Sequence, residues 1–285
     1  MMKVGFIGLG HLGKAIAQHL ITEGIPLIVW NRTKTKASTL GVPVASTPGQ
    51  LIGEVDVVIL NLFDSGAVRS VLEGPDGLLS GDCKGKIIID TTTNHFEQVL
   101  KFHERAKECG AVYLECTLLG SVVPASQGSL TVLVSGEPDV FDEVKPLLEK
   151  MGRSIYYLHE PSLATKMKLI NNLVLGSLMA TCAEAVALGE ASGLERETVV
   201  NILLSGAGNS MVLNAKKENL VKGVFDPQFT SALIYKDLHY LQDLCRTLGR
   251  PLFTGSVVKE VYAMARARGL ANQDFSGIYQ VFSEY

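Results

Sequence analysis

The chain has 285 residues, of which 47% are hydrophobic, and its formal net charge at pH 7 is −3. This length and composition indicate a globular protein that can bury a large core and form two domains, and they exclude an intrinsically disordered chain. The small net charge and the lack of a long basic run argue against nucleic acid or an anionic membrane surface as the main partner.

The five cysteines form no CxxC pair, and no zinc-ligand spacing appears among the cysteines and histidines; they are Cys83, Cys109, Cys116, Cys182 and Cys245. This pattern is typical of reduced, mostly buried thiols, so we expect a cytoplasmic protein without a metal site. Cleavage of a signal peptide would remove the motif described next, so we expect none.

The first motif is a strand, a glycine-rich turn and a helix. Lys3–Ile7 is an apolar strand pattern that leads into Gly8-Leu9-Gly10-His11-Leu12-Gly13, and a helix pattern and a second strand, Leu27–Trp30, follow. Gly8 allows the tight turn, Gly10 lets the backbone approach a pyrophosphate, and Gly13 lets the helix pack on the sheet. The free N–H groups at the helix start favour phosphate, so residues 8–13 are predicted to bind a dinucleotide.

The residues after the second strand indicate which dinucleotide binds. An NAD site has Asp or Glu there, to bind the ribose 2′-hydroxyl, whereas this chain has Asn31-Arg32-Thr33. Arg32 can pair with a 2′-phosphate and Thr33 can donate a hydrogen bond to it. We therefore predict NADP(H) in preference to NAD(H). The alternative is that Arg32 is an ordinary surface residue.

Up to about residue 160, short strand patterns alternate with helix patterns, which predicts a mostly parallel, doubly wound sheet. The further strands are expected at residues 56–60, 86–90, 112–115, 130–134 and 155–158, and the helices at 14–21, 47–53, 66–72, 95–109 and 140–151. Ligands of such sheets lie beyond the carboxyl ends of the strands, so Leu62, which follows the third strand, is a further candidate for cofactor binding.

After Glu160-Pro161 the pattern is helical throughout, with helices expected at 162–193, 195–204, 211–219, 230–248, 255–268 and 275–282. The fold class is therefore α/β: a Rossmann domain, residues 1–160, followed by an all-α domain, residues 161–285, built on a long central helix. That helix is interrupted by Glu184 and Glu190, which indicates a buried helix and not a membrane span. Its apolar faces imply neighbours beyond its own domain, hence a homodimer or homotetramer.

The helical half opens with a candidate catalytic pair. Lys168 and Asn172 are four residues apart, so they share one helix face. A lysine that is partly desolvated in a cleft has a lowered pKa and can exchange a proton with a substrate oxygen. The alternative is a solvated surface lysine, which is the role that we expect for Lys166.

Four motifs occur in one order along the chain: Gly8-Leu9-Gly10-His11-Leu12-Gly13, Asp90-Thr91-Thr92-Thr93, Lys168-Leu169-Ile170-Asn171-Asn172, and Phe229 with Lys236-Asp237-Leu238. Together they resemble the β-hydroxyacid dehydrogenase family, which includes 3-hydroxyisobutyrate dehydrogenases, tartronate semialdehyde reductases and glyoxylate/succinic semialdehyde reductases. The resemblance runs essentially from end to end. Asn31-Arg32-Thr33 is most similar to the NADPH-using glyoxylate/succinic semialdehyde branch.

The resemblance implies a role for each position. Lys168 would be the general acid/base, and Asn172 would orient a small hydroxyacid or semialdehyde. Thr93 would lie beside the nicotinamide and the substrate, and Lys236 would reach the cofactor. Phe229 and Asp237 would border the substrate pocket. Other readings remain open: Thr93 as a helix cap, Lys236-Asp237 as a solvated pair, and Phe229 as a core residue.

The chain also departs from the family pattern. The substrate loop of the family has a Pro-Val-Ser-Gly core, followed in the glyoxylate branch by two lysines. Here Leu119 stands in the place of the serine, Gly120-Ser121 follow, and Val122-Val123 replace the lysines. Glyoxylate is expected to bind poorly unless Ser121 takes over, since the lost hydrogen bond is worth about 1.5–3 kcal/mol. Ser162-Leu163-Ala164 also replaces a Gly-x-Gly before the lysine.

Three functions follow from these observations. The first is NADPH-dependent hydride transfer between the nicotinamide and a carbonyl or alcohol carbon, with Lys168 as acid/base. The second is reduction of a bulkier, more apolar carbonyl or of an imine; imine reductases are relatives that usually replace the catalytic lysine, which favours carbonyl chemistry here. The third is an NADP-binding sensor or scaffold without turnover, which the altered substrate loop suggests and the retained Lys168 and Asn172 oppose.

Overall fold

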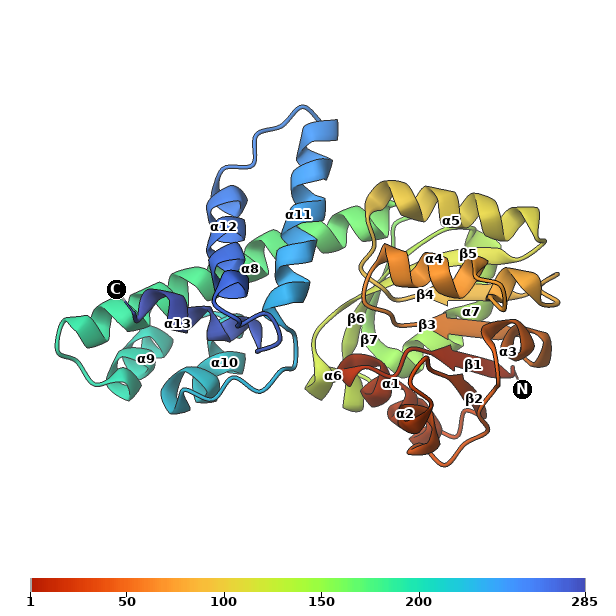
Figure 1. Ribbon diagram of the computed structural model, residues 1–285, viewed down its shortest axis with the longest axis horizontal. Coiled ribbons are helices and arrows are strands. Elements are labelled where there is room, and N and C mark those ends of the chain that lie inside the picture. Colours follow the sequence, from red (N-terminus) through yellow and green to blue (C-terminus); the bar gives the residue numbers. More distant parts are fainter. Residues whose placement is uncertain (1, 285) are drawn as a thin grey trace. The chain divides into compact units, whose positions relative to one another are not determined.

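The computed structural model describes residues 2–284, and the chain divides into two compact units, Met1–Lys168 and Leu169–Tyr285. The first unit contains a seven-stranded sheet in the order β2-β1-β3-β4-β5-β6-β7 (Figure 1). The strands are β1 Val4–Ile7, β2 Leu27–Trp30, β3 Val57–Leu60, β4 Ile87–Asp90, β5 Val112–Leu119, β6 Leu130–Ser135 and β7 Gly152–Tyr157. Strands β1 to β5 are parallel, and β6 pairs with β5 in the antiparallel direction.

Helices cover both faces of the sheet, and each face has its own core. The helices of this unit are α1 His11–Thr22, α2 Lys34–Ser38, α3 Pro48–Glu54, α4 Ser65–Glu73, α5 Phe96–Glu108, α6 Val122–Ser126, α7 Pro138–Met151 and a 3₁₀ turn, η1 Leu78–Ser80. Along β3, Val57 and Ile59 join the core beneath α1 and α7, whereas Val58 and Leu60 join the core beneath α3, α4 and α5. Alternate side chains of a strand point to opposite faces, so runs of apolar residues are buried on both sides.

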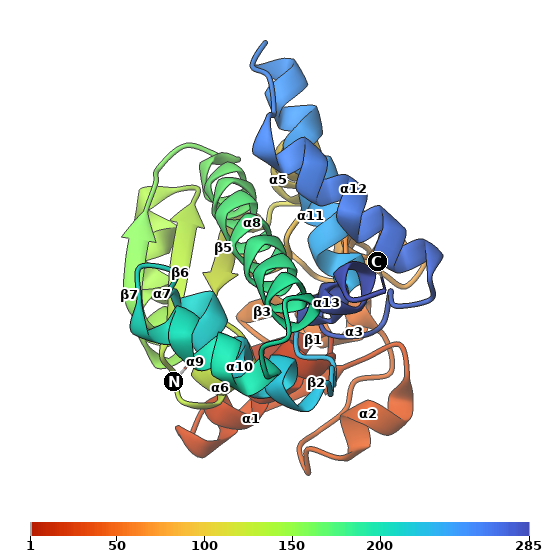
Figure 2. The same cartoon turned by 90° about the vertical axis from the view of Figure 1, so that its left-hand side faces the viewer.

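The second unit is entirely helical among the residues described. Its helices are α8 Leu163–Ala191, which begins in the first unit, α9 Arg196–Ser205, α10 Met211–Lys222, α11 Ser231–Thr247, α12 Thr254–Ala267, the 3₁₀ turn η2 Phe275–Ile278 and α13 Tyr279–Phe282. Figures 1 and 2 show α11 and α12 side by side. A Cβ atom at Gly189 of α8 would lie 2.5 Å from Val199 of α9, so glycine is what lets these two helices approach so closely.

The fold class predicted from the sequence is confirmed: an N-terminal Rossmann sheet is followed by an all-α region that starts with a 29-residue helix. Some short elements and strand ends differ. The five-residue helices α2 and α6 were not expected, β5 continues to Leu119, four residues beyond its predicted end, and β7 begins at Gly152, three residues before its predicted start. Five residues are too few to show helical periodicity, and the extra part of β5 is held by pairing to β6, which the sequence does not reveal.

Helix α8 is the one helix within residues 2–284 that is long and apolar enough to cross a membrane by length and composition. The most apolar window of this helix is 44% buried in the structure. Core helices of soluble proteins pass the same test, so this property alone is weak evidence for a membrane span.

Candidate active site

The glycine-rich turn has the geometry that a dinucleotide site requires. Gly8 has a φ of +102°, and a Cβ atom there would lie 2.1 Å from the carbonyl oxygen of Asn61. A Cβ atom at Gly13 would lie 2.0 Å from the carbonyl oxygen of Gly8. Gly10, in contrast, has open space around its Cβ position. Gly8 and Gly13 therefore allow the turn to form, while Gly10 leaves room for a pyrophosphate at the start of α1.

Asn31, which directly follows β2, stabilises this turn through hydrogen bonds of its side-chain amide. Its Oδ1 atom accepts a hydrogen bond from the backbone N–H of Leu9 at 2.9 Å, and its Nδ2 atom donates to the carbonyl oxygen of Thr33 at 2.9 Å. The side chains of Arg32 and Thr33 are exposed beside it. Thr33 precedes α2, and its hydroxyl makes no capping hydrogen bond there. Asn31 thus shapes the loop, and Arg32 and Thr33 remain accessible to a ligand.

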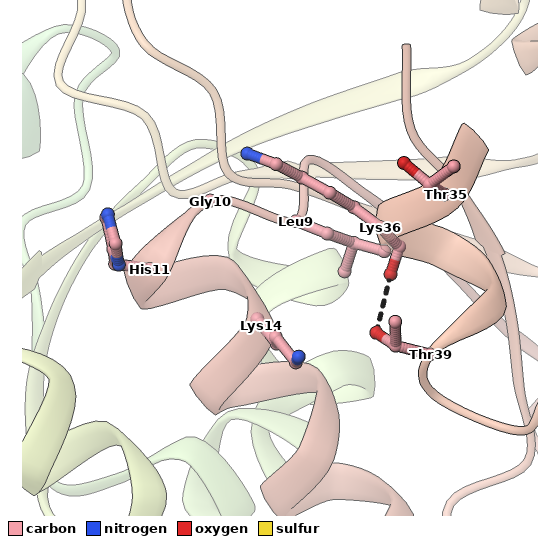
Figure 3. Close-up of a pocket in the computed structure, with 7 residues that line it drawn as sticks. All are labelled: Leu9, Gly10, His11, Lys14, Thr35, Lys36 and Thr39. Carbon is pink, nitrogen blue, oxygen red and sulfur yellow. Dashed lines mark hydrogen bonds between the residues drawn. The ribbon is translucent and has the colours of Figure 1, made fainter. Parts of the chain in front are cut away.

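A cavity of about 330 Å³ lies next to the glycine turn (Figure 3). Its lining residues are Leu9, Gly10, His11, Lys14, Thr35, Lys36 and Thr39. Lys14 comes from α1 and Lys36 from α2, and no carboxylate lines the cavity. Both lysines were missed in the sequence analysis, although Lys36 belongs to a short run in which Arg32, Lys34 and Lys36 alternate with threonines. A positively charged cavity of this kind suits a phosphate group.

The loops that follow β3 and β4 are tied together. The Asn61 amide donates to Thr91 Oγ1 at 2.8 Å, and the N–H of Leu62 donates to Thr92 Oγ1 at 2.9 Å. These bonds hold Leu62 at the carboxyl edge of the sheet, where it was predicted. Thr93 follows Thr92 in the same loop, and the N-cap of α5 is His95 and not Thr93.

Asp90 organises the loop that carries Thr93. The buried carboxylate accepts hydrogen bonds from the N–H of Thr92 at 2.8 Å, from the amide of Asn94 at 2.7 Å and from the Tyr113 hydroxyl. Burial raises the pKa of Asp90, and the hydrogen bonds counteract part of this effect. Burial, followed by the neighbouring Asp90, raises the pKa of Tyr113 well above its usual value. These hydrogen bonds hold the loop that carries Thr93 in one conformation. They do so without requiring a ligand to contact Asp90, Asn94 or Tyr113.

The first turn of α8 is anchored to the sheet by Glu115, which the sequence analysis missed. This buried carboxylate accepts hydrogen bonds from the N–H of Ser162, from the N–H of Thr165 at 3.2 Å and from Thr165 Oγ1 at 2.7 Å. Thr117 Oγ1 donates to the carbonyl oxygen of Ala164 at 3.1 Å. A carboxylate at a helix N-terminus satisfies free N–H groups and is favoured by the helix dipole.

Lys168 lies one turn after Ala164 and is only 8% exposed, so it is not the solvated surface lysine of the alternative reading. Lys166 is half-buried, with its ammonium 6.0 Å from the centre of the Phe96 ring. Ser162, which occupies a glycine position of the family pattern, has a φ of +76°, the left-handed region that favours glycine.

The helical unit holds the remaining predicted residues in a second group. Asn172 is fully buried, and its Nδ2 atom donates to Asp237 Oδ2 at 2.6 Å. The Lys236 ammonium lies 2.8 Å from Asp237 Oδ1, and only 11% of the Lys236 side chain is exposed. Lys236 and Asp237 are therefore a buried pair and not a solvated one. The Phe229 ring packs edge-on against Phe275, with 5.6 Å between the ring centres.

Family models match both units. The NAD-binding domain of 6-phosphogluconate dehydrogenase matches residues 3–159, and the NAD-binding region of NADP-dependent 3-hydroxyisobutyrate dehydrogenase matches residues 163–282. The chain belongs to the β-hydroxyacid dehydrogenase family. It is an NAD(P)-dependent oxidoreductase of the β-hydroxyacid dehydrogenase type.

The proteins to which the chain is similar include both a reductase and a protein named as a nuclear factor. It is 32% identical to glyoxylate/succinic semialdehyde reductase 1 of Arabidopsis thaliana, over 98% of each chain. It is 30% identical to the human cytokine-like nuclear factor N-PAC, of which it spans about half the length: 98% of this chain matches 51% of N-PAC. The solved structure of Psf3 in complex with NADP+ and 2-OPP has a TM-score of 0.91 and 28% identity, and the match covers 98% of this chain and 100% of Psf3.

Proposed function

We propose that this protein transfers hydride between NADP(H) and the carbonyl or alcohol carbon of a small hydroxyacid or semialdehyde, with Lys168 as the general acid/base. The observation that carries the proposal is the burial of Lys168 on a helix whose first turn is fixed by Glu115 and Thr117. A protonatable group held in this way is suited to proton exchange with a substrate oxygen. The similarity to the Arabidopsis reductase supports the substrate class.

The proposed preference for NADP(H) over NAD(H) is supported by the positively charged side chains at the end of β2 and in the neighbouring cavity. The end of β2 carries Arg32 where an NAD site needs a carboxylate, and Lys14 and Lys36 line the neighbouring cavity. The related Psf3 structure contains NADP+. The open Cβ position of Gly10 and the free N–H groups at the start of α1 fit the pyrophosphate of either cofactor.

The bound nicotinamide supplies or accepts the hydride, and the proposed work of the protein is to move one proton and to orient the substrate. Protonated Lys168 gives its proton to the oxygen of a carbonyl during reduction, and neutral Lys168 accepts it from the alcohol during oxidation. Asn172, oriented by Asp237, and Thr93, held by the Asp90 network, are proposed to position the substrate. Lys236 is proposed to contact the cofactor, and Phe229 to border the substrate.

Replacement of Lys168 tests this proposal, with Lys166 as a matched control on the same helix. For Lys168→Ala we expect kcat/KM for a panel of semialdehydes to fall by about 10²–10⁴-fold, the usual contribution of general acid–base catalysis. The dissociation constant for NADPH, measured by fluorescence titration, is expected to stay within about twofold, because Lys168 acts on the substrate. Lys166→Ala is expected to retain turnover. Turnover at the wild-type rate by Lys168→Ala would show that another group moves the proton.

A further inference from the structure

Two buried carboxyl groups lie next to each other in the sheet. Asp90 and Glu115 are register partners on the parallel strands β4 and β5, and each residue is 1% exposed. Asp90 holds the loop that carries Thr93, and Glu115 holds the first turn of α8, which leads to Lys168. A carboxylate in the interior needs hydrogen-bond donors to offset its lost hydration. The donors to these two groups therefore determine where both segments lie.

His103 of α5 supplies one of the donors to Glu115. Its Nε2 atom lies 3.4 Å from Glu115 Oε1, and the imidazole is the donor because an ionised carboxylate only accepts hydrogen bonds. The helix directs this side chain towards β5, since His103 lies four residues after Val99 and three before Ala106, which are both fully buried (Figure 1). Only 18% of the His103 side chain is exposed.

Two further contacts restrict the imidazole of His103. It packs edge-on against the ring of Tyr113, with 4.9 Å between the ring centres. In the loop after β6, a Cβ atom at Gly136 would lie 3.6 Å from His103 Cε1, so a single methyl group would fill the space between this loop and the imidazole. The position of Nε2 relative to Glu115 is therefore set by packing as well as by the hydrogen bond.

Tyr113 connects His103 to the second carboxyl group. The Tyr113 hydroxyl donates to Asp90, and burial, followed by the neighbouring Asp90 and Glu115, raises the pKa of Tyr113 well above its usual value. Tyr113 thus stays protonated and remains a donor at neutral pH. His103 contacts both the carboxylate that fixes the start of α8 and the tyrosine that helps to fix the loop of Thr93.

The hydrogen bond from His103 bears directly on the start of α8. Glu115 Oε1 accepts from His103 and from the N–H of Ser162, whereas Oε2 accepts from the N–H and the hydroxyl of Thr165. A carboxylate that loses one donor to Oε1 can rotate towards the remaining donors, and the helix start moves with it. Lys168 lies within one turn of Thr165, so its ammonium is displaced as well. A misplacement of about 1 Å at a reacting group can lower a rate by about 100-fold.

We propose that His103 is a positioning residue for the general acid/base: through Glu115 it fixes the start of α8 and thereby the place of the Lys168 ammonium. The inference rests on the proposed function and assigns His103 no contact with substrate or cofactor. His103 lies outside the four motifs that carry the family resemblance, so the resemblance does not predict this role.

Substitutions of His103 with and without a donor test the inference. His103→Leu removes the hydrogen bond, whereas His103→Gln keeps a side-chain N–H. The assay uses NADPH and the semialdehyde that the wild type reduces fastest. For His103→Leu we expect kcat to fall by at least about 10-fold while KM for the semialdehyde and Kd for NADPH stay within about twofold, because the proton donor is misplaced and binding is not changed. His103→Gln is expected to keep kcat within about threefold of the wild type, since its N–H replaces the lost donor.

A core variant of the same helix distinguishes positioning from a general loss of packing. Val99→Ala leaves a cavity beneath α5, so it is expected to lower Tm while kcat stays within about twofold. Equal falls of kcat in His103→Leu and Val99→Ala, or a loss in His103→Gln as large as that in His103→Leu, would overturn the positioning role.

A double-mutant cycle with Glu115→Gln tests the path through the carboxylate. We expect Glu115→Gln to lower kcat by itself and the addition of His103→Leu to lower it by less than about twofold more, because both substitutions break the same anchor. Two losses that multiply would show that His103 does not act through Glu115.

The outcomes separate this inference from the proposed function. A normal kcat in His103→Leu, together with a large loss in Lys168→Ala, would overturn the inference and leave the proposed function intact. A wild-type protein that binds NADPH but reduces no semialdehyde, or normal turnover by Lys168→Ala, would overturn the proposed function and the inference with it.

Discussion

Arg32 and Lys36 are the residues most suited to distinguish NADPH from NADH. Both side chains are exposed, and neither makes a hydrogen bond or an ion pair within residues 2–284. A charged hydrogen bond to the 2′-phosphate is worth about 1.5–3 kcal/mol, or about 10–150-fold in affinity. We expect Arg32→Ala and Lys36→Ala each to raise the dissociation constant for NADPH by at least about 10-fold and that for NADH by less than about twofold, in fluorescence titrations.

Lys34→Ala is the matched control for these variants, because Lys34 is an exposed lysine of the same short helix that does not line the cavity. Its affinity for both cofactors is expected to stay close to that of the wild type. Equal losses of NADPH and NADH affinity in Arg32→Ala or Lys36→Ala would contradict the 2′-phosphate assignment. They would point to a role in folding of the loop or in binding of the pyrophosphate.

The sequence predicted the glycine turn well because each glycine meets a local steric requirement that does not depend on distant residues. Gly8 and Gly13 have backbone oxygens within 2.1 Å of their Cβ positions. Glu115 was missed for the opposite reason, since its partners Ser162 and Thr165 are 47 and 50 residues away in the chain. The sequence does show a carboxylate within an otherwise apolar strand pattern. Only the fold shows that this carboxylate is buried and which N–H groups donate to it.

At the start of α8, Ser162 adopts a backbone conformation that a glycine would tolerate better. A left-handed conformation costs about 1–2 kcal/mol for a residue with a Cβ atom, and the buried Ser162 hydroxyl has no partner within the described chain. The greater freedom of glycine in the unfolded state offsets part of the gain. We therefore expect Ser162→Gly to stabilise the protein by about 1 kcal/mol and to raise Tm by about 2–4 °C in a thermal unfolding experiment.

Ser70→Gly is the control for that variant, because the exposed Ser70 lies in the interior of α4. A glycine in a helix interior costs about 0.5–1 kcal/mol, so this substitution is expected to lower Tm. A fall of Tm in Ser162→Gly as well would show that the left-handed conformation at Ser162 is not strained. The N–H of residue 162 still donates to Glu115 in the glycine variant, so the anchor of the helix is kept.

The strands and long helices were predictable because their apolar patterns repeat over many residues. Phe96–Glu108 buries Phe96, Val99, Phe102 and Ala106, a spacing of three and four that fits one helix face. Helices α2 and α6 are too short to show such a periodicity. Helix α2 follows the residues predicted to bind the cofactor, 31–33, and α6 follows those predicted to bind the substrate, 119–121. The elements that the sequence leaves undefined are thus the short ones beside the site, where tertiary contacts override local pattern.

At the scale of the whole molecule, α8 carries an apolar stripe that is exposed in the single chain. Its residues recur every three or four positions and are 37–54% exposed; they are Leu163, Met167, Ile170, Val174 and Leu178. Water-exposed stripes of this kind usually mark an interface. We propose that α8 contributes to a homodimer, a self-complementary contact being the commonest arrangement in symmetric oligomers.

The double variant Val174→Glu/Leu178→Glu tests this proposal by placing two carboxylates in the stripe. Burial of unpaired carboxylates is costly, so the assembled form is expected to dissociate. Light scattering after size exclusion should then give the 30.7 kDa mass of one chain, while the wild type gives twice that mass or more. Leu100→Glu, an equally exposed apolar residue of α5, should leave the assembly intact. A double variant with the mass of the wild type would exclude this stripe from the interface, and a wild-type protein with the mass of one chain would refute the homodimer itself.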